Sequence, residues 1–296
     1  RSNTTGRASQ AGPRRPGLAG RACGGVIMGR ILRCFSNSCT RDKHGGYMPR
    51  PLSVQSFCFR EFPENQVTAG MVKECGLSGI EICRKHVDFA NTSVYESVLE
   101  TYRSAGVSVV SIGVNQITGD EAEDRKLFEF AKKAGCPAMS VDFPLPTLDK
   151  SLAVAERLTE EYGIPVGIHN HGGGHWLGNA TALRWVFGKT SGRVGLSLDT
   201  GWTQDSRQDP VAWIREFGDR VHLLHLKDFV FAKNREPEEA ILGEGNLDLP
   251  AVASALSDTG FSGLSIIEYE GDPANPVPPI KRCVAAVRDK LSAFFD

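Results

Sequence analysis

The stretch PVGIHNHGGG, residues 165–174, joins a short apolar strand to a run of three glycines. Side chains alternate across a strand, so Val166 and Ile168 share one face while His169 and His171 share the other. We expect the apolar face to meet a layer of helices and the two imidazoles to point into the space that the strand encloses. The glycines would let the chain turn close to a ligand, because no side chain obstructs it.

The same pattern, a β-rich run followed by a stretch of helical period, recurs along the chain. Eight runs have the composition of strands: LSVQSFCF, GIEIC, VSVVSIGV, AMSVDF, PVGIHNH, VGLSLDT, RVHLLHLKD and LSIIEYE. The stretches between them, such as residues 92–106 and 121–135, are amphipathic. In the second, acids begin the segment and lysines precede a terminal glycine, as is typical of a helix. Strands that alternate with helices predict a parallel sheet.

The spacing of these units indicates how the sheet is arranged. Successive strand ends are roughly 28 residues apart, and only the last interval is longer, at about 42 residues. Eight such units over residues 51–296 predict an α/β protein with a closed (β/α)8 TIM barrel. A doubly wound open sheet is the main alternative, and it rarely repeats eight even units.

Residues 1–50 differ in character from the rest. They contain ten lysines and arginines against one acid, Asp42, and this leaves residues 51–296 with a net negative charge. Large apolar residues are too few to offset the entropy cost of ordering, so we predict a disordered basic leader. It could be a transit peptide or a twin-arginine export signal, although no apolar segment follows the arginine pair. A start placed too early, with Met28 or Met48 as the true initiator, is the other interpretation.

Composition also bears on compartment and partners. The five cysteines after residue 50 include no CxxC pair, which is typical of a reducing compartment, and no run of about 18 apolar residues could span a bilayer. We therefore expect a cytoplasmic protein that does not bind membranes. The negative charge of residues 51–296 opposes binding to a phosphate backbone, so we expect no nucleic-acid partner.

Four consecutive strands end in a polar residue that alternation places inside the barrel: His169, Asp199, His225 and Glu268. Barrel enzymes carry their chemistry at this end of the strands. An isolated ionised carboxylate would be costly there, and a divalent cation satisfies two imidazoles and two carboxylates at once. The alternative is that the histidines pair with the carboxylates without a metal.

From residue 51 to the end, the sequence resembles the xylose-isomerase-like sugar isomerase and epimerase superfamily. That superfamily also includes inosose dehydratases and an abasic-site DNA endonuclease. The resemblance rests on VQSFCFREF (54–62), GIEIC (79–83), IHNHGG (168–173), LSLDTG (196–201), VHLLHLKD (221–228), LGEGNLDLPAV (242–252) and GLSIIEYE (263–270). It implies one divalent ion, Mn, Mg, Co or Zn, with ligands His169, Asp199, His225 and Glu268.

Two departures from the family pattern affect the expected mechanism. The chain has HNH at 169–171 where many relatives have ENH, so only Glu268 remains as a glutamate base and a symmetric two-glutamate epimerisation is disfavoured. The chain also has Trp202 after DTG, where relatives often have histidine. The DNA-repair relative needs that histidine for a multi-zinc cluster, so its loss disfavours nuclease activity.

Further residues receive predicted roles. Glu268, or a water that it orients, is the predicted base. Lys227 would polarise a substrate oxygen, or else form an ion pair with Asp228 or Glu81. His171 would shuttle a proton or orient a hydroxyl, or else make a supporting hydrogen bond.

Four residues are predicted to contact the substrate. Trp202 offers an apolar face on which a sugar ring could stack, although it could instead pack beneath a loop. Glu81 ends the second strand facing inward and Arg60 follows the first, and either could bind hydroxyls or form a structural salt bridge. His86, in the loop after Glu81, could reach the mouth of the barrel.

These residues predict a divalent-metal-dependent sugar isomerase or epimerase that acts by α-proton abstraction and a metal-stabilised enediolate. A keto-sugar or inosose dehydratase on the same barrel is the alternative, because a lyase needs only one base. An abasic-site endonuclease and a metal-free, non-catalytic relative are less favoured. The expected partner is a small sugar or keto-sugar, and a homo-oligomer is possible.

Overall fold

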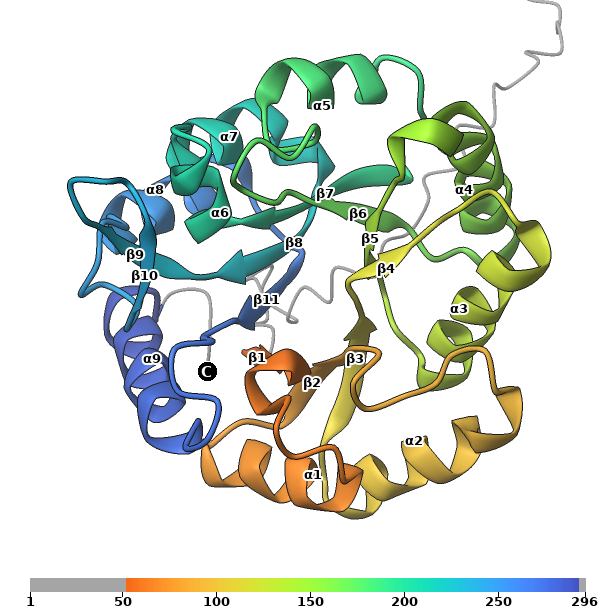
Figure 1. The fold of residues 1–296 in the computed structure, drawn as a ribbon, viewed down its shortest axis with the longest axis horizontal. Helices are drawn as coiled ribbons and strands as arrows, with labels where there is room; N and C mark the ends of the chain where they lie inside the picture. The colour runs from red at the N-terminus through yellow and green to blue at the C-terminus, as the bar shows by residue number, and fades with distance from the viewer. Residues whose placement is uncertain (1–51, 293–296) are drawn as a thin grey trace, which may run out of the picture. The chain divides into compact units, whose positions relative to one another are not determined.

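Strands of one parallel sheet curl into a ring with helices around its outside (Figure 1). The structure is a computed structural model that describes residues 52–292, so the predicted leader lies outside the described residues. The order of neighbours in the sheet is β3-β2-β1-β11-β8-β7-β6-β5-β4. The strands are β1 Ser53–Gln55, β2 Gly79–Ile82, β3 Ser108–Ile112, β4 Asn115–Gln116, β5 Met139–Asp142, β6 Val166–His169, β7 Val194–Asp199, β8 Val221–Leu226 and β11 Leu264–Ile267.

The two edge strands of this sheet are consecutive along the chain. β3 pairs with β2 and β4 pairs with β5, and only Gly113 and Val114 separate the two strands. The predicted third strand, residues 107–114, thus forms only β3, and the short strand β4 just after it completes the other edge of the ring. The predicted (β/α)8 barrel is confirmed, and the open sheet is wrong.

The first predicted strand is shorter than expected. LSVQSFCF forms only β1, and Ser56–Phe59 turns into a short 3-10 helix. The cause is local, because the side-chain oxygen of Gln55 accepts the N–H of Phe57 at 3.1 Å and caps the turn.

The helices follow the strands as the amphipathic stretches predict. They are α1 Asn65–Glu74, α2 Tyr95–Ser104, α3 Glu121–Ala134, α4 Leu148–Tyr162, α5 Ala180–Phe187, α6 Thr200–Asp205, α7 Pro210–Phe217, α8 Leu249–Thr259 and α9 Val277–Lys290. In α3 the Asp120 side chain accepts the N–H of Glu123, and Gly135 ends the helix at φ +76°. The terminal glycine is the end signal expected for residues 121–135, whereas the cap by Asp120 lies just before that segment.

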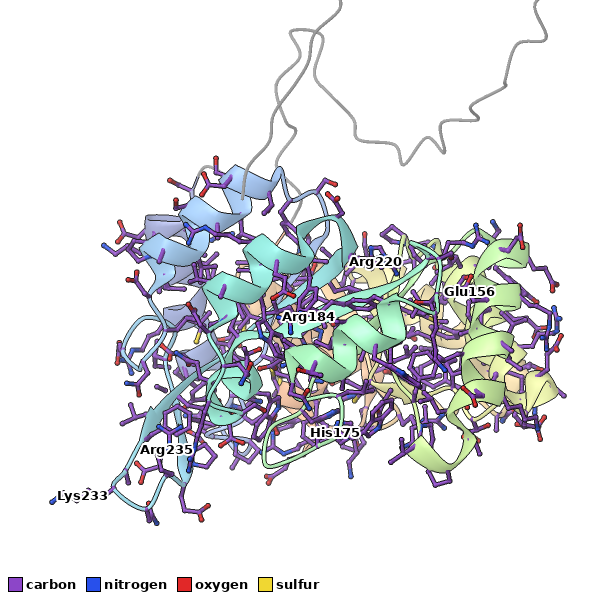
Figure 2. The ribbon with its side chains drawn as sticks, turned by 90° about the horizontal axis from the view of Figure 1, so that it is seen from above. Glu156, His175, Arg184, Arg220, Lys233 and Arg235 are labelled. Carbon is purple, nitrogen blue, oxygen red and sulfur yellow. The ribbon has the colours of Figure 1, made fainter. Side chains whose placement is uncertain are left out.

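The long seventh connection contains an antiparallel hairpin, β9 Asp228–Phe231 and β10 Pro237–Ala240. The carboxylate of Asp228 accepts the N–H groups of Gly243, Gly245 and Leu247, which ties the loop after the hairpin to the end of β8. Figure 2 shows Lys233 and Arg235 at the projecting tip of this hairpin, on the same side of the barrel as His175.

Inward-facing side chains change character along the barrel. Near the starts of the strands, an apolar cluster closes the interior: Val110, Ala138, Leu223, Leu264 and Ile266. Towards the strand ends, the same faces carry polar groups, since His225 follows Leu223 and Glu268 follows Ile266 at the two-residue period. The polar groups therefore lie at the end where barrel enzymes place their sites.

The cysteines of the described part are all buried and none forms a disulfide: Cys58, Cys75, Cys83, Cys136 and Cys283. Across residues 52–292, no helix has the length and apolar character needed to cross a membrane.

Candidate metal centre and its cavity

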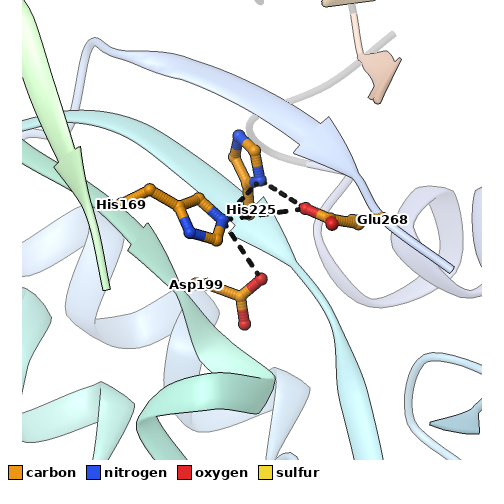
Figure 3. A group of neighbouring side chains, drawn as sticks. All are labelled: His169, Asp199, His225 and Glu268. Atoms are coloured by element: carbon orange, nitrogen blue, oxygen red, sulfur yellow. Dashed lines mark hydrogen bonds and ion pairs between the residues drawn. The ribbon is translucent and has the colours of Figure 1, made fainter. Parts of the chain in front are cut away.

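The structure brings together the four side chains that end consecutive strands: His169 (β6), Asp199 (β7), His225 (β8) and Glu268 (after β11). One ligand atom from each lies within 4.8 Å of the others, and all four residues are buried (Figure 3). Parallel strands in near register explain this, since Asp199 lies directly opposite His225 and Ile266 also pairs with His225.

The facing atoms are two imidazole nitrogens and two carboxylate oxygens. His169 Nε2 lies 3.2 Å from His225 Nδ1 and 3.6 Å from Asp199 Oδ2. Glu268 Oε2 lies 2.6 Å from His225 Nδ1 and 3.8 Å from His169 Nε2. All the donor atoms thus point at one small region.

Asp199 provides the test of whether this donor set fits a cation. Its Oδ2 is buried and has no donor within hydrogen-bonding distance, since its nearest recorded partner, His169 Nε2, lies 3.6 Å away, while its Oδ1 accepts the N–H of Trp202 at 2.7 Å. A buried carboxylate oxygen without a donor is costly unless a cation neutralises it. Two nitrogens and two oxygens suit a divalent transition metal such as Zn, Mn or Co. The residues therefore fit a divalent ion.

Asn170 holds the ends of β6 and β7 together from the outer face of the barrel. Its amide accepts the N–H of Asp199 at 2.9 Å and donates to the carbonyl of Asp199 at 3.1 Å and to the hydroxyl of Thr203 at 3.0 Å. The main chain on either side of the Asp199 carboxylate is thus fixed, and so is the direction in which that carboxylate points.

The histidines are influenced by the carboxylates around them. Burial lowers the pKa of His225, but the charges of Glu81 and Glu268 outweigh it and raise that pKa to about 10. For His169 burial likewise lowers the pKa, and hydrogen bonding to Asp199 and Glu268 raises it above its ordinary value. Without a cation, the carboxylates thus favour the protonated form of both imidazoles.

Lys227 is fully buried beside this cluster. Its ammonium pairs with Glu270, with Glu239 Oε1 at 3.1 Å and with Glu268 Oε1 at 3.6 Å. Burial lowers the pKa of Lys227, but the surrounding carboxylates hold it well above its usual range. The predicted alternative partners, Asp228 and Glu81, are wrong, because Asp228 binds the loop after the hairpin and Glu81 contacts His225.

A cavity of about 520 Å³ opens above the cluster. The residues that line its wall include Phe57, His169, His171, Trp202, Glu268 and Glu270. Trp202 packs its ring edge-on against Phe229, with centroids 5.0 Å apart, and presents an aromatic wall to the cavity. Burial, with the charges of His169 and His175, lowers the pKa of His171 to about 4, so this ring is neutral near pH 7.

Three residues predicted to bind substrate do not line this cavity. Arg60 donates to the carbonyl of Glu270 at 2.9 Å and stacks on Phe57, so it supports the cavity wall from behind. The ring of His86 is buried and lies 3.1 Å from the carbonyl of Phe62. Glu81 is fully buried inside the barrel. Their sequence positions near strand ends did not reveal which way these side chains turn.

Two glutamates near the cluster have no role in the sequence prediction. Glu270 lies on the cavity wall and pairs with Lys227. Its two-residue spacing from Glu268 was an available signal. Glu239 reaches Lys227 from β10, and nothing local in the sequence indicates that contact.

The glycine run has a structural reason within the chain itself. Gly173 and Gly174 have φ of +61° and +88°, which other residues rarely adopt. A side chain at Gly172 would overlap Trp202 and Asp205 of α6. The run thus allows the loop to lie close to helix α6.

A family model described as "Xylose isomerase-like TIM barrel" matches residues 70–289. The rhizopine catabolism protein MocC of Rhizobium meliloti is 31% identical over 139 residues, which cover 42% of each chain. An inosose dehydratase of Erwinia tasmaniensis is 30% identical over 139 residues, covering 41% of this chain and 46% of that one. The chain thus matches less than half the length of either relative.

Two solved structures illustrate the likeness of fold. The IolI protein with a bound zinc atom gives a TM-score of 0.67 at 17% identity, over 83% of this chain and 100% of that one. The 3-keto-D-glucoside 4-epimerase YcjR of E. coli gives 0.62 at 18% identity, over 81% and 98%. At these identities the likeness shows the fold alone.

Proposed function

Because the chain belongs to the xylose isomerase-like TIM-barrel family, we propose that it is a divalent-metal-dependent enzyme that removes the proton α to the carbonyl of a sugar-like substrate. The observation that carries the proposal is the convergence of four buried donor atoms at the base of a cavity. The Oδ2 of Asp199 supports it, since this buried oxygen has no donor within hydrogen-bonding distance and a cation would neutralise it.

The ion would be held by His169, Asp199, His225 and Glu268. When bound, it supplies positive charge that stabilises the enediolate left after the proton departs. Its two neutral nitrogen ligands suit Zn, Mn or Co better than Mg, which prefers oxygen.

Glu268 is the proposed base. It lines the cavity, and burial raises its pKa while Lys227 and the two imidazoles hold that pKa well below the ordinary range. The carboxylate is therefore ionised and able to accept a proton. Lys227 lies 3.6 Å from Glu268 Oε1, where its charge favours negative charge that develops on the substrate.

The cavity wall supplies the remaining proposed roles. Trp202 offers its aromatic face to the apolar side of a sugar ring. His171 is neutral and carries a buried Nδ1 without a hydrogen-bond partner, so it is able to orient a substrate hydroxyl or pass a proton.

Isomerisation or epimerisation follows if the proton returns to the neighbouring carbon or to the opposite face. Dehydration follows if a β-hydroxyl leaves instead. A specific observation favours this second candidate: the donor set found among the described residues contains one glutamate, and the relatives at 30% to 31% identity include an inosose dehydratase. A lyase needs only one base for α-proton removal.

The two outcomes are separable by NMR in D2O. Manganese-loaded protein is incubated with ketohexoses and with a keto-inositol, and Glu268→Gln serves as the control because it removes the base with little change of shape. Deuterium uptake with retention of all hydroxyls supports isomerisation, whereas a product lacking one water supports dehydration. Absence of both reactions in the loaded wild type across these substrates would contradict the proposal.

A further inference from the structure

We propose that Glu81 is a positioning residue for the metal centre: it fixes the ring of His225 so that Nδ1, and not Nε2, faces the cation. This inference rests on the proposed function, because it concerns the same metal site. Glu81 touches neither the cavity nor the other three donors in the contacts that the structure records. Its action is therefore exerted through His225.

The two nitrogens of His225 face opposite directions. Nδ1 lies 2.6 Å from Glu268 Oε2 and 3.2 Å from His169 Nε2, so it faces the other donors. Nε2 lies 3.1 Å from Glu81 Oε1, deeper in the barrel. Both side chains are fully buried. In the recorded contacts Glu81 pairs with Nε2 and Glu268 with Nδ1, and the hydroxyl of Ser140 also lies 3.4 Å from Nε2, so a rotation of the ring would disturb these contacts.

The carboxylate of Glu81 is itself held in place. Gln55 Nε2 donates to Oε1 at 2.5 Å and also to the carbonyl of Gly113 at 3.2 Å. The hydroxyl of Ser140 donates to Oε2 at 3.2 Å. The orientation of the Glu81 carboxylate towards His225 is thus fixed by residues of β1, of the β3–β4 connection and of β5.

The backbone at Gly113 is shaped around this group. A Cβ there would overlap Ser140 and lie 3.2 Å from Glu81 Oε1, closer than side-chain carbons normally approach. The absence of a side chain at Gly113 therefore lets the carbonyl of residue 113, Ser140 and Glu81 come together beneath the centre.

The chemical consequence follows from what a carboxylate can do. A carboxylate oxygen in this place accepts a hydrogen bond, so the Nε2 of His225 keeps its hydrogen and Nδ1 is the nitrogen that would give up its proton to bind a cation. A carboxylate behind a ligating histidine also makes the imidazole a better donor to a metal, and loss of such a partner typically weakens metal binding.

The test compares Mn²⁺ affinity by calorimetry in four variants at one pH. Glu81→Ala removes the acceptor and should weaken binding by about 10- to 100-fold. Glu81→Gln keeps a carbonyl oxygen at the same reach and should recover most of that loss, whereas Glu81→Asp withdraws the acceptor and should behave like Glu81→Ala. Asp124→Ala is the matched control, because Asp124 is also a buried carboxylate but binds the N–H groups of Thr118 and Gly119, outside the cavity.

A merely structural role makes a different prediction. It would lower the melting temperature of Glu81→Ala and Asp124→Ala alike and leave Mn²⁺ affinity unchanged in the folded protein. Wild-type affinity in Glu81→Ala, or an equal loss in Asp124→Ala, would overturn the inference while the proposed function stands. Failure of the wild type itself to bind Mn²⁺, Zn²⁺ or Co²⁺ would overturn both. Where Glu81→Ala does not fold, the comparison of Glu81→Gln with Glu81→Asp decides.

Discussion

The Oδ1 of Asp199 accepts the main-chain N–H of Trp202 at 2.7 Å, so one carboxylate caps helix α6 while its other oxygen faces the donor cluster. The helix start thus fixes the direction of a ligand atom, and the same turn places Trp202 on the cavity wall. The cap of α6, the proposed metal ligand and the cavity wall thus all lie within the four residues from Asp199 to Trp202.

Replacement of Asp199 by asparagine separates the two roles of this side chain. The asparagine side chain keeps an oxygen for the Trp202 N–H, since asparagine caps helices as well as aspartate does. The anionic ligand is lost, so Mn²⁺ affinity should fall by more than the roughly 10- to 100-fold typical of a lost supporting partner. Calorimetry measures the affinity, and circular dichroism of metal-free protein checks the fold. Unchanged affinity would contradict the assignment of Asp199 as a ligand.

Substitution of His169 by glutamate converts the HNH sequence at 169–171 into ENH and adds a third carboxylate to the donor cluster. The new carboxylate would lie close to two others, because His169 Nε2 is now 3.6 Å from Asp199 Oδ2 and 3.8 Å from Glu268 Oε2. Without metal, the added charge should lower the melting temperature by roughly 5 °C, because like charges repel in a buried site. Mn²⁺ should raise the melting temperature more than it does in wild type. Scanning calorimetry with Mn²⁺ and with EDTA tests this, and an equal shift in both proteins would argue against it.

Lys227 should be essential to the integrity of the cavity wall. Methionine there leaves Glu239, Glu268 and Glu270 without their shared cation, and breaking a buried ion pair costs about 3–5 kcal/mol. The melting temperature should fall by roughly 10 °C. Adding Glu270→Gln to the variant should recover part of that loss, because one uncompensated charge is removed. A double mutant no more stable than the single one would show that the ion pair is not responsible.

Acid sensitivity should depend partly on His222, which lies on β8 away from the metal centre. Burial lowers its pKa from 6.5 to about 4, and its Nε2 donates to the carbonyl of Gly192 at 3.0 Å. The unfolded chain thus takes up a proton first as pH falls. The contribution of His222 to the free energy of unfolding is therefore fully present above pH 6.5 and is lost as the pH falls to about 4.

His222→Gln provides the comparison, because glutamine offers an N–H donor and does not titrate. The melting temperature should fall less steeply between pH 6.5 and 4 in this variant than in the wild type. Parallel curves, measured by circular dichroism in matched buffers, would show that His222 does not contribute.

The sequence alone was sufficient for the barrel and for the inward direction of His169, Asp199, His225 and Glu268. The reason is that alternation along a strand and helical period are local properties, which a chain carries in its order of residues. Parallel strands then bring their C-terminal ends to one rim, so the four side chains meet without any further information.

Contacts across the barrel interior could not be predicted from local sequence patterns. The pairing of Glu81 with His225 depends on register, and the β2–β3 and β7–β8 pairings both shift register, between Ile80 and Glu81 and between Leu196 and Ser197. Each register shift changes which inward-facing side chains of neighbouring strands lie beside one another at the same height in the barrel. Sequence reasoning therefore counted Glu81 among the residues that could bind substrate, whereas the structure buries it against His225.

The environment of Lys227 was likewise decided by the tertiary structure. The sequence showed that the seventh connection is longer than the others. Only the structure shows that this connection forms the β9–β10 hairpin, which brings Glu239 into contact with Lys227. Local pattern determined which strands form and which faces are polar, because those depend on neighbours in sequence. Which charges meet in the interior was set by ring closure, register and the hairpin, because those depend on residues far apart in the chain.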